Sequence, residues 1–196
     1  MIADRFRIGN CPVSIFQYSG ELRRLLAIYR ALQPQTVLEI GSLYGGTLWH
    51  WMKNAPGATI ISVDLPVGLY DFRHDDVIAA RSRWSGWARE FDCTLIDLAG
   101  HSQSPDIFAQ VNGFAPLDFV FVDGDHSFAG VDGDFRLYAP LVRPGGVMAF
   151  HDIAYLDANP EQIDVGRWWR ALKGLDRIEI FEYQNQVDWG IGVIQL

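Results

Sequence analysis

Short apolar runs alternate along the chain with segments whose apolar residues recur at helical spacing. The runs lie at 36–40, 59–63, 93–98, 118–122, 147–150, 177–183 and 189–195. Runs this short, bounded by glycine, proline and polar residues, are typical of buried strands. The last two are separated only by a short polar loop, which predicts an antiparallel hairpin at one edge of a sheet.

Helical spacing is found between most of these runs. We expect helices at 14–33, 48–53, 74–91, 105–112 and 164–173. A further helix is expected after Ser127, which could act as its N-cap. Residues 143–146 (Arg-Pro-Gly-Gly) are interpreted as a turn. Strands that alternate with helices predict an α/β fold, a doubly wound, mainly parallel, seven-stranded Rossmann-like sheet with an antiparallel C-terminal hairpin.

The carboxyl ends of the first five strands carry polar or glycine-containing groups. These are Glu39-Ile40-Gly41, Asp64, Gly100-His101-Ser102, Asp123-Gly124-Asp125-His126 and His151-Asp152. Ligands of open α/β sheets bind outside the carboxyl ends of the strands. Five such ends in succession predict a ligand crevice there.

The carboxyl ends of the first two strands suggest a nucleoside ligand. The segment from Gly41 to Gly46 forms a tight turn into a helix, but it is not G-x-G-x-x-G, so the dinucleotide fingerprint is broken at its second glycine. Asp64 stands where an acidic residue accepts hydrogen bonds from ribose hydroxyls, although an aspartate that caps a loop would look the same. Glu39 would be costly to bury unpaired, and a ligand that carries an ammonium beside a carboxylate would suit it.

Composition argues against some classes of binding partner. The net charge of −8 argues against nucleic acid and anionic membranes. No apolar run approaches a membrane span, and the first residues lack a signal-peptide core, so a cytoplasmic protein is expected. Cys11 and Cys93 lie far apart without metal-ligand spacing, as expected of reduced thiols.

Several motifs resemble class I S-adenosylmethionine-dependent methyltransferases. Val37-Leu38-Glu39-Ile40-Gly41, Gly45-Gly46-Thr47 and Val63-Asp64 resemble the first two motifs of that superfamily. Asp123-Gly124-Asp125-His126-Ser127-Phe128 and Phe150-His151-Asp152 resemble the D-G-D-H-S-[YF] and F-H-D signatures of a small bacterial branch. That branch is related to the catechol, caffeoyl-CoA and macrolide-sugar O-methyltransferases. The resemblance covers roughly residues 34–196.

We expect two parts, an N-terminal helical cap segment (1–33), which carries no resemblance, and the part that the resemblance implies to be an S-adenosylmethionine-binding methyltransferase domain (34–196). Its cofactor-binding positions fall on Glu39, Gly41, Ser42, Gly45, Asp64, Leu65, Gly100, His101, Ser102 and Asp123. The glycine turn would hold the methionine part, Asp64 the ribose and residues 100–102 the adenine. Relatives often have Gly-Asp-Ser in the last segment, so His101 is a departure.

The fourth and fifth strand ends supply candidate metal ligands and catalytic groups. Neighbouring parallel strands lie about 4.8 Å apart, so Asp123 and Asp152 could share a divalent cation, with His151 or Asp125 as a further ligand. Mg²⁺ prefers carboxylate oxygens, whereas an imidazole ligand favours Mn²⁺ or Zn²⁺; alternatively, these side chains only cap the strand and orient a loop. We expect His126 as the general base and His151 as the second candidate. The resemblance implies that Asp123 faces the sulfonium and the reacting centre.

These observations predict an S-adenosylmethionine-dependent methyltransferase that methylates a hydroxyl of a small-molecule acceptor, with metal assistance left open. N-methylation, an NAD-dependent oxidoreductase and a non-catalytic cofactor-binding protein are the alternatives. The acceptor pocket is expected from residues 1–20, 155–164 and 70–74, with Tyr18, Tyr155 and Trp168 as candidate walls. A homodimer could form through the N-terminal helix and the C-terminal hairpin.

Overall fold

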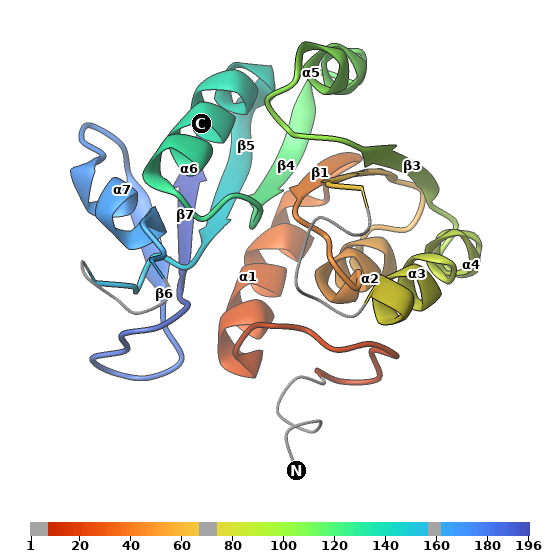
Figure 1. The fold of residues 1–196 in the computed structure, drawn as a ribbon, viewed down its shortest axis with the longest axis horizontal. Coiled ribbons are helices and arrows are strands. Elements are labelled where there is room, and N and C mark those ends of the chain that lie inside the picture. The colour runs from red at the N-terminus through yellow and green to blue at the C-terminus, as the bar shows by residue number, and fades with distance from the viewer. Residues whose placement is uncertain (1–7, 67–73, 157–161) are drawn as a thin grey trace.

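The computed structural model describes residues 8–66, 74–156 and 162–196, and they build a seven-stranded sheet (Figure 1). The strands are β1 (Thr36–Ile40), β2 (Thr59–Asp64), β3 (Thr94–Ala99), β4 (Leu117–Val122), β5 (Val142–His151), β6 (Arg177–Ile180) and β7 (Ile191–Gln195). Their order is β3-β2-β1-β4-β5-β7-β6, and β7 pairs antiparallel with both of its neighbours while the other pairs are parallel. The predicted fold class is confirmed.

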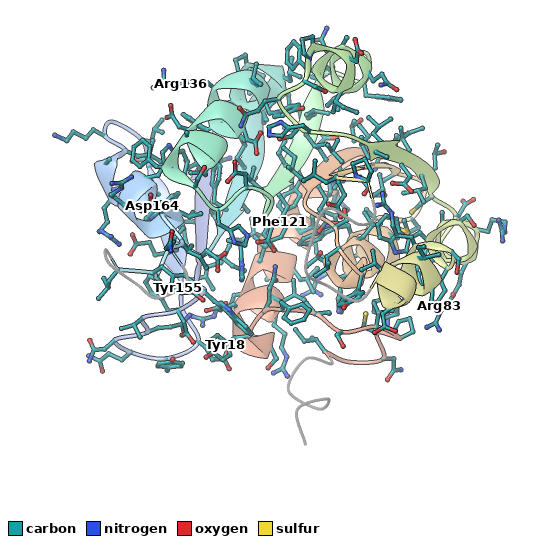
Figure 2. All side chains as sticks on the ribbon, in the orientation of Figure 1. Tyr18, Arg83, Phe121, Arg136, Tyr155 and Asp164 are labelled. Atoms are coloured by element: carbon teal, nitrogen blue, oxygen red, sulfur yellow. The ribbon has the colours of Figure 1, made fainter. Side chains whose placement is uncertain are left out.

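Helices cover both faces of the sheet because the strands are apolar on both sides. The helices are α1 (Ser19–Leu32), α2 (Gly46–Asn54), α3 (His74–Arg81), α4 (Trp84–Glu90), α5 (Pro105–Asn112), α6 (Phe128–Tyr138) and α7 (Val165–Ala171), with a 3₁₀ turn at Ala139–Leu141. Along β4, Phe119 and Phe121 join the core under α1 and α2, while Val120 and Val122 join the core under α5, α6 and α7. Figure 2 shows Phe121 near the centre of the molecule. Among the described residues, no helix is long and apolar enough to cross a membrane.

The first helix begins later than the sequence predicts. The expected helix starts at Ser14, but α1 starts at Ser19, and Tyr18 before it is extended at φ −69° and ψ 140°. The reason is tertiary packing. Ile15 is 2% exposed and lies against Gly46, where a Cβ atom would overlap Ile15 Cγ1. Residues 14–17 therefore form a wall beside the glycine turn instead of a first helical turn.

The single helix expected at 74–91 is two helices, α3 and α4. At the break, the Arg83 N–H donates to Ala80 O (3.0 Å), three residues back, and Ser82 Oγ donates to Ala79 O (2.8 Å). A serine hydroxyl that bonds the preceding turn weakens a helix. The break turns Trp84 inward, where its Nε1 donates to Tyr44 O (3.2 Å) in the glycine turn.

Residues 143–146, expected to form a turn, belong to β5. The register with β4 shifts between the Leu117–Val142 and Phe119–Val147 pairs, so the extra residues are absorbed as an irregularity inside the strand. Arg143 pairs there with Asp118, whose other oxygen accepts the backbone N–H groups of residues 35 and 36. The turn residues thus bend a strand instead of ending it.

A close backbone contact joins the ends of β1 and β4. Gly41 N donates to Val63 O (2.9 Å), and Asp123 N donates to Ile40 O (2.8 Å). Gly41 has φ +88°, and a Cβ atom there would overlap the carbonyl oxygen of Asp123. Only glycine allows both this conformation and this approach.

We expect Gly41→Ala to destabilise the protein much more than Gly57→Ala. Both glycines have positive φ, but a Cβ atom at Gly57 would meet nothing within 4 Å. Gly57→Ala should therefore cost roughly 1 kcal/mol of unfolding free energy from backbone strain alone. Gly41→Ala should cost about 3 kcal/mol or more, because overlap with Asp123 adds to the strain. Urea denaturation of both variants measures the difference, and equal losses would contradict the contact.

Candidate functional site

The sheet register brings four of the predicted strand ends to one edge. Ile40 pairs with Val63 and Val122, and Val122 pairs with Phe150. The next residues along β1, β2, β4 and β5 are Gly41, Asp64, Asp123 and His151. A pocket opens at this edge, lined by residues 14–17, 41–44, 46, 47 and Asp123.

The glycine turn is fixed by the protein around it. Gly45 has φ +78°, and a Cβ atom there would overlap the indole Nε1 of Trp84. Leu43 also has a positive φ of 46°. The turn is thus held in its unusual conformation by packing, and it presents its backbone along the pocket.

Glu39 is fully buried, and its carboxyl group accepts hydrogen bonds from three side chains of the protein. Trp51 Nε1 donates at 3.1 Å, Ser42 Oγ at 3.0 Å, and Thr47 Oγ1 also donates to it. The pleat of β1 directs this side chain toward α2, so its bonds run to α2 and to the glycine turn. The ammonium partner that the sequence suggested is not needed to satisfy it. Burial raises the pKa of Glu39 to about 8, although the three donors oppose this rise.

Asp64 ties two loops of the predicted cofactor site together. Its side chain is 7% exposed, and Oδ2 accepts the Leu43 N–H (2.7 Å) while Oδ1 accepts the Leu65 N–H (2.8 Å). Burial raises the pKa of this carboxyl, and the backbone donors lower it in part. A carboxylate has about four acceptor positions, so two remain for ligand hydroxyls.

The three residues after β3 (100–102) differ in where they lie. Gly100 N donates to Asp64 O (2.8 Å), which keeps the segment beside β2. Ser102 is buried, and its Oγ donates to Asp134 Oδ1 (2.7 Å) on α6. His101 is exposed, and its Nδ1 accepts the Gln103 N–H (3.1 Å). The Ser102 side chain therefore forms its hydrogen bond with α6, whereas the His101 imidazole is exposed at the surface.

Two aspartates and two histidines cluster at the ends of β4 and β5. His151 Nδ1 lies 3.2 Å from Asp123 Oδ1 and 3.2 Å from Asp152 Oδ1. His126 Nε2 lies 3.6 Å from Asp123 Oδ1 and 3.5 Å from Asp152 Oδ2. The four predicted side chains are thus brought together, each imidazole within reach of both carboxylates.

Charge pairing dominates the protonation states of this cluster. Burial raises the pKa of Asp123, but the two imidazoles lower it to about 2. Burial lowers the pKa of His151, but Asp123 and Asp152 outweigh it and raise that pKa well above its ordinary value. The same carboxylates raise the pKa of His126 against its own desolvation. The cluster therefore favours an ionised Asp123 beside protonated imidazoles.

Exposure separates the two histidines. The His151 side chain is 4% exposed, whereas that of His126 is 41% exposed. His126 lies near the end of the loop between β4 and α6, and the first turn of α6 is capped by Ser127 Oγ, which accepts the Gly130 N–H (3.0 Å). A molecule in the crevice can reach His126 far more readily than His151.

Asp123, His126 and Asp152 could hold a metal ion. They offer one ligand atom each, and these three atoms lie within 4.8 Å of one another. The sequence prediction named His151 in place of His126. His151 points its Nδ1 at the two aspartates, while its Nε2 is buried and has no hydrogen-bond partner among the residues that the structure describes.

Parts of the expected acceptor pocket lie elsewhere or outside the described residues. Trp168 is 1% exposed and packs against Phe150 at a ring distance of 4.8 Å, so it belongs to the core. Tyr18 packs on Trp189 at 4.6 Å, at the start of α1 (Figure 2). Residues 67–73 and 157–161 are outside the described chain.

Comparisons with known proteins find a matching family and a similar viral protein. Residues 38–153 match the family described as Methyltransferase domain. An uncharacterized protein of Acanthamoeba polyphaga mimivirus is 28% identical over 128 residues, which is 60% of this chain and 51% of the viral protein. The match thus spans about half the length of that relative.

Solved structures share the fold. The O-methyltransferase TomG from Streptomyces achromogenes, in complex with SAM, has a TM-score of 0.67 at 17% identity, over 95% of this chain and 82% of TomG. An O-methyltransferase from Bacillus cereus in complex with SAH has a TM-score of 0.66 at 17% identity, over 96% and 84% of the two chains. MycE from the mycinamycin biosynthetic pathway, with Mg and SAH, has a TM-score of 0.55 at 22% identity, over 91% of this chain and 50% of MycE.

We expect Glu39→Gln to remove a pH dependence of stability. The folded-state pKa of about 8 exceeds the ordinary value of 4.5, so between these values the folded protein holds a proton that the unfolded chain has released. The wild-type unfolding free energy should therefore fall relative to the variant as pH rises from about 5 to 8, by at most about 1.4 kcal/mol per pH unit. Chemical denaturation at matched pH values gives both curves, and a constant offset between them would contradict the buried titration.

Proposed function

Because the Methyltransferase domain family matches more than half of its residues, this chain belongs to that family, and we propose that it transfers the methyl group of S-adenosylmethionine to a hydroxyl of a small molecule. The observation that carries the proposal is the position of Asp123. This residue lines the pocket at the glycine turn and also contacts His126 and His151. One side chain thus joins the proposed cofactor pocket to groups that can move a proton.

Methyl transfer from a sulfonium is an in-line displacement at carbon, and the cofactor supplies the leaving group. The protein must align the acceptor hydroxyl and remove its proton. His126 in its neutral form suits this role, because its side chain is partly exposed and the two nearby carboxylates stabilise the imidazolium that forms when it takes the proton. Since these carboxylates also raise the pKa of His126, the neutral form gains population as the pH rises. Buried His151 is better placed to hold Asp123 and Asp152 in position.

A divalent cation fits the same cluster. Two carboxylates and an imidazole are donors that Mn²⁺ accepts, and Mg²⁺ would use the carboxylates with water. Asp123 and Asp152 would hold the ion. Such an ion would favour the ionised form of an acceptor hydroxyl. Asp152 has φ +67°, so its backbone is set in an uncommon conformation at this position.

The comparisons support methyl transfer over the alternatives from the sequence. The family description favours methylation over hydride transfer by an oxidoreductase. TomG and the Bacillus cereus protein are both described as O-methyltransferases, which supports oxygen over nitrogen as the acceptor atom. The net charge of −8 supports a small molecule over nucleic acid as the acceptor.

The function is tested with S-adenosylmethionine labelled in its methyl group. The protein is incubated with pools of phenols, catechols and sugars, with and without Mn²⁺, and the products are separated and identified. We expect label in a methyl ether together with stoichiometric S-adenosylhomocysteine. Label on nitrogen would replace the proposed acceptor atom, and consumption of NAD(H) without methyl transfer would contradict the proposal.

We expect His126→Gln to reduce methyl transfer while sparing metal affinity. Loss of a general base should lower kcat about 100-fold or more. The Kd for Mn²⁺, measured by calorimetry, should change less than about tenfold, because Asp123 and Asp152 remain. Asp152→Asn is the matched variant, since asparagine tolerates positive φ, and it should weaken Mn²⁺ about tenfold or more. Loss of Mn²⁺ binding in His126→Gln would make His126 a ligand and not the base.

A further inference from the structure

Gln17 is a buried amide without a hydrogen-bond partner in the described part of the chain. Its side chain is 1% exposed, and neither Nε2 nor Oε1 bonds to any described residue. Buried polar groups are nearly always hydrogen-bonded, so an amide with both ends unpaired requires an explanation. Gln17 also lines the pocket at the glycine turn, together with Gly41, Thr47 and Asp123.

The amide is held at this position from both sides. Before it, Ile15 is buried against Gly46, and Phe16 stacks on Tyr44 at 6.1 Å. After it, the Tyr18 hydroxyl donates to Asp188 Oδ2 (3.1 Å). The segment therefore cannot turn Gln17 toward solvent without giving up these contacts.

The other polar side chains of the pocket point to the kind of ligand. The hydroxyls of Ser42 and Thr47 already donate to Glu39. Asp123 is the only charged residue among those that line the pocket in the described chain, and Gln17 is the only one whose side chain carries N–H groups. A ligand with an ammonium and a carboxylate would find an anion in Asp123, and both a donor and an acceptor in the amide.

We propose that Gln17 binds the α-amino acid end of S-adenosylmethionine, its Nε2–H donating to the carboxylate and its Oε1 accepting from the ammonium. This inference rests on the proposed function. The start of α2 supports it, because Gly46 and Thr47 line the same pocket and the N-terminus of a helix attracts anions. Gln17 thereby couples the N-terminal segment to cofactor binding.

The test compares two ligands, S-adenosylhomocysteine and 5′-methylthioadenosine, of which the second lacks the amino acid end. Calorimetry gives both affinities for the wild type and for Gln17→Leu. We expect the variant to bind S-adenosylhomocysteine about tenfold or more weakly, while 5′-methylthioadenosine changes less than about twofold. The ligand-free variant should be as thermally stable as the wild type or more so, because leucine removes an unpaired buried amide.

Controls separate the outcomes. Gln110→Leu, on the exposed face of α5, should change neither affinity. Should Gln17→Leu not fold, Gln17→Glu retains the size and places a negative charge against the ligand carboxylate, so the same selective loss is expected. Parallel losses for both ligands, or no loss, would overturn this inference alone. A folded wild type that binds neither ligand would overturn the proposed function, and this inference with it.

Discussion

The contact between Gly41 and the Asp123 carbonyl sets the geometry on which the site depends. It closes the ends of β1 and β4 so tightly that no side chain fits between them. Asp123 is thereby placed at the pocket wall, and His126 follows three residues later, where Ser127 caps α6. On the other side, β5 delivers His151 beside the same carboxylate. The crevice forms because the carboxyl ends of β1 and β4 lie this close together.

Two acidic side chains near this contact, Glu39 and Asp123, have pKa values shifted in opposite directions. Glu39 faces the apolar core under α1 and α2 and receives only neutral donors, so burial raises its pKa to about 8. Asp123 faces two imidazoles, which lower its pKa to about 2. Environments that push the pKa values of neighbouring carboxyls apart are a common way to divide structural and chemical roles. Here the ionised carboxylate of Asp123 lies at the crevice, paired with the imidazoles, and Glu39 inside the protein favours its neutral form.

Much of the fold could be predicted from the sequence, because local signals and tertiary structure agree. The apolar run at 36–40 is β1 itself, and Pro105 at the first turn with Asn112 at the end bounds α5 as expected. The strand-end residues were predicted to meet because parallel strands place their carboxyl ends together, and Asp123, His126, His151 and Asp152 do meet.

The remaining features depend on contacts that a linear pattern does not contain. Residues 14–17 were expected to belong to the first helix but pack against the glycine turn, and the α3–α4 break depends on where Trp84 is anchored. The direction of Glu39 follows from the pleat of β1, and the bond from Ser102 to Asp134 follows from how α6 packs. Gln17 carries no sequence signal at all. Its unpaired amide is visible only once the fold has buried it.

A crystal structure of the protein with S-adenosylhomocysteine and Mn²⁺ would show whether this crevice is the methyl-transfer site. We expect the ribose hydroxyls at Asp64, the sulfur facing Asp123, and the space beyond the sulfur open toward His126. S-adenosylhomocysteine bound away from the carboxyl edge of the sheet, or with its sulfur turned away from Asp123 and His126, would contradict the assignment of this crevice as a methyl-transfer site.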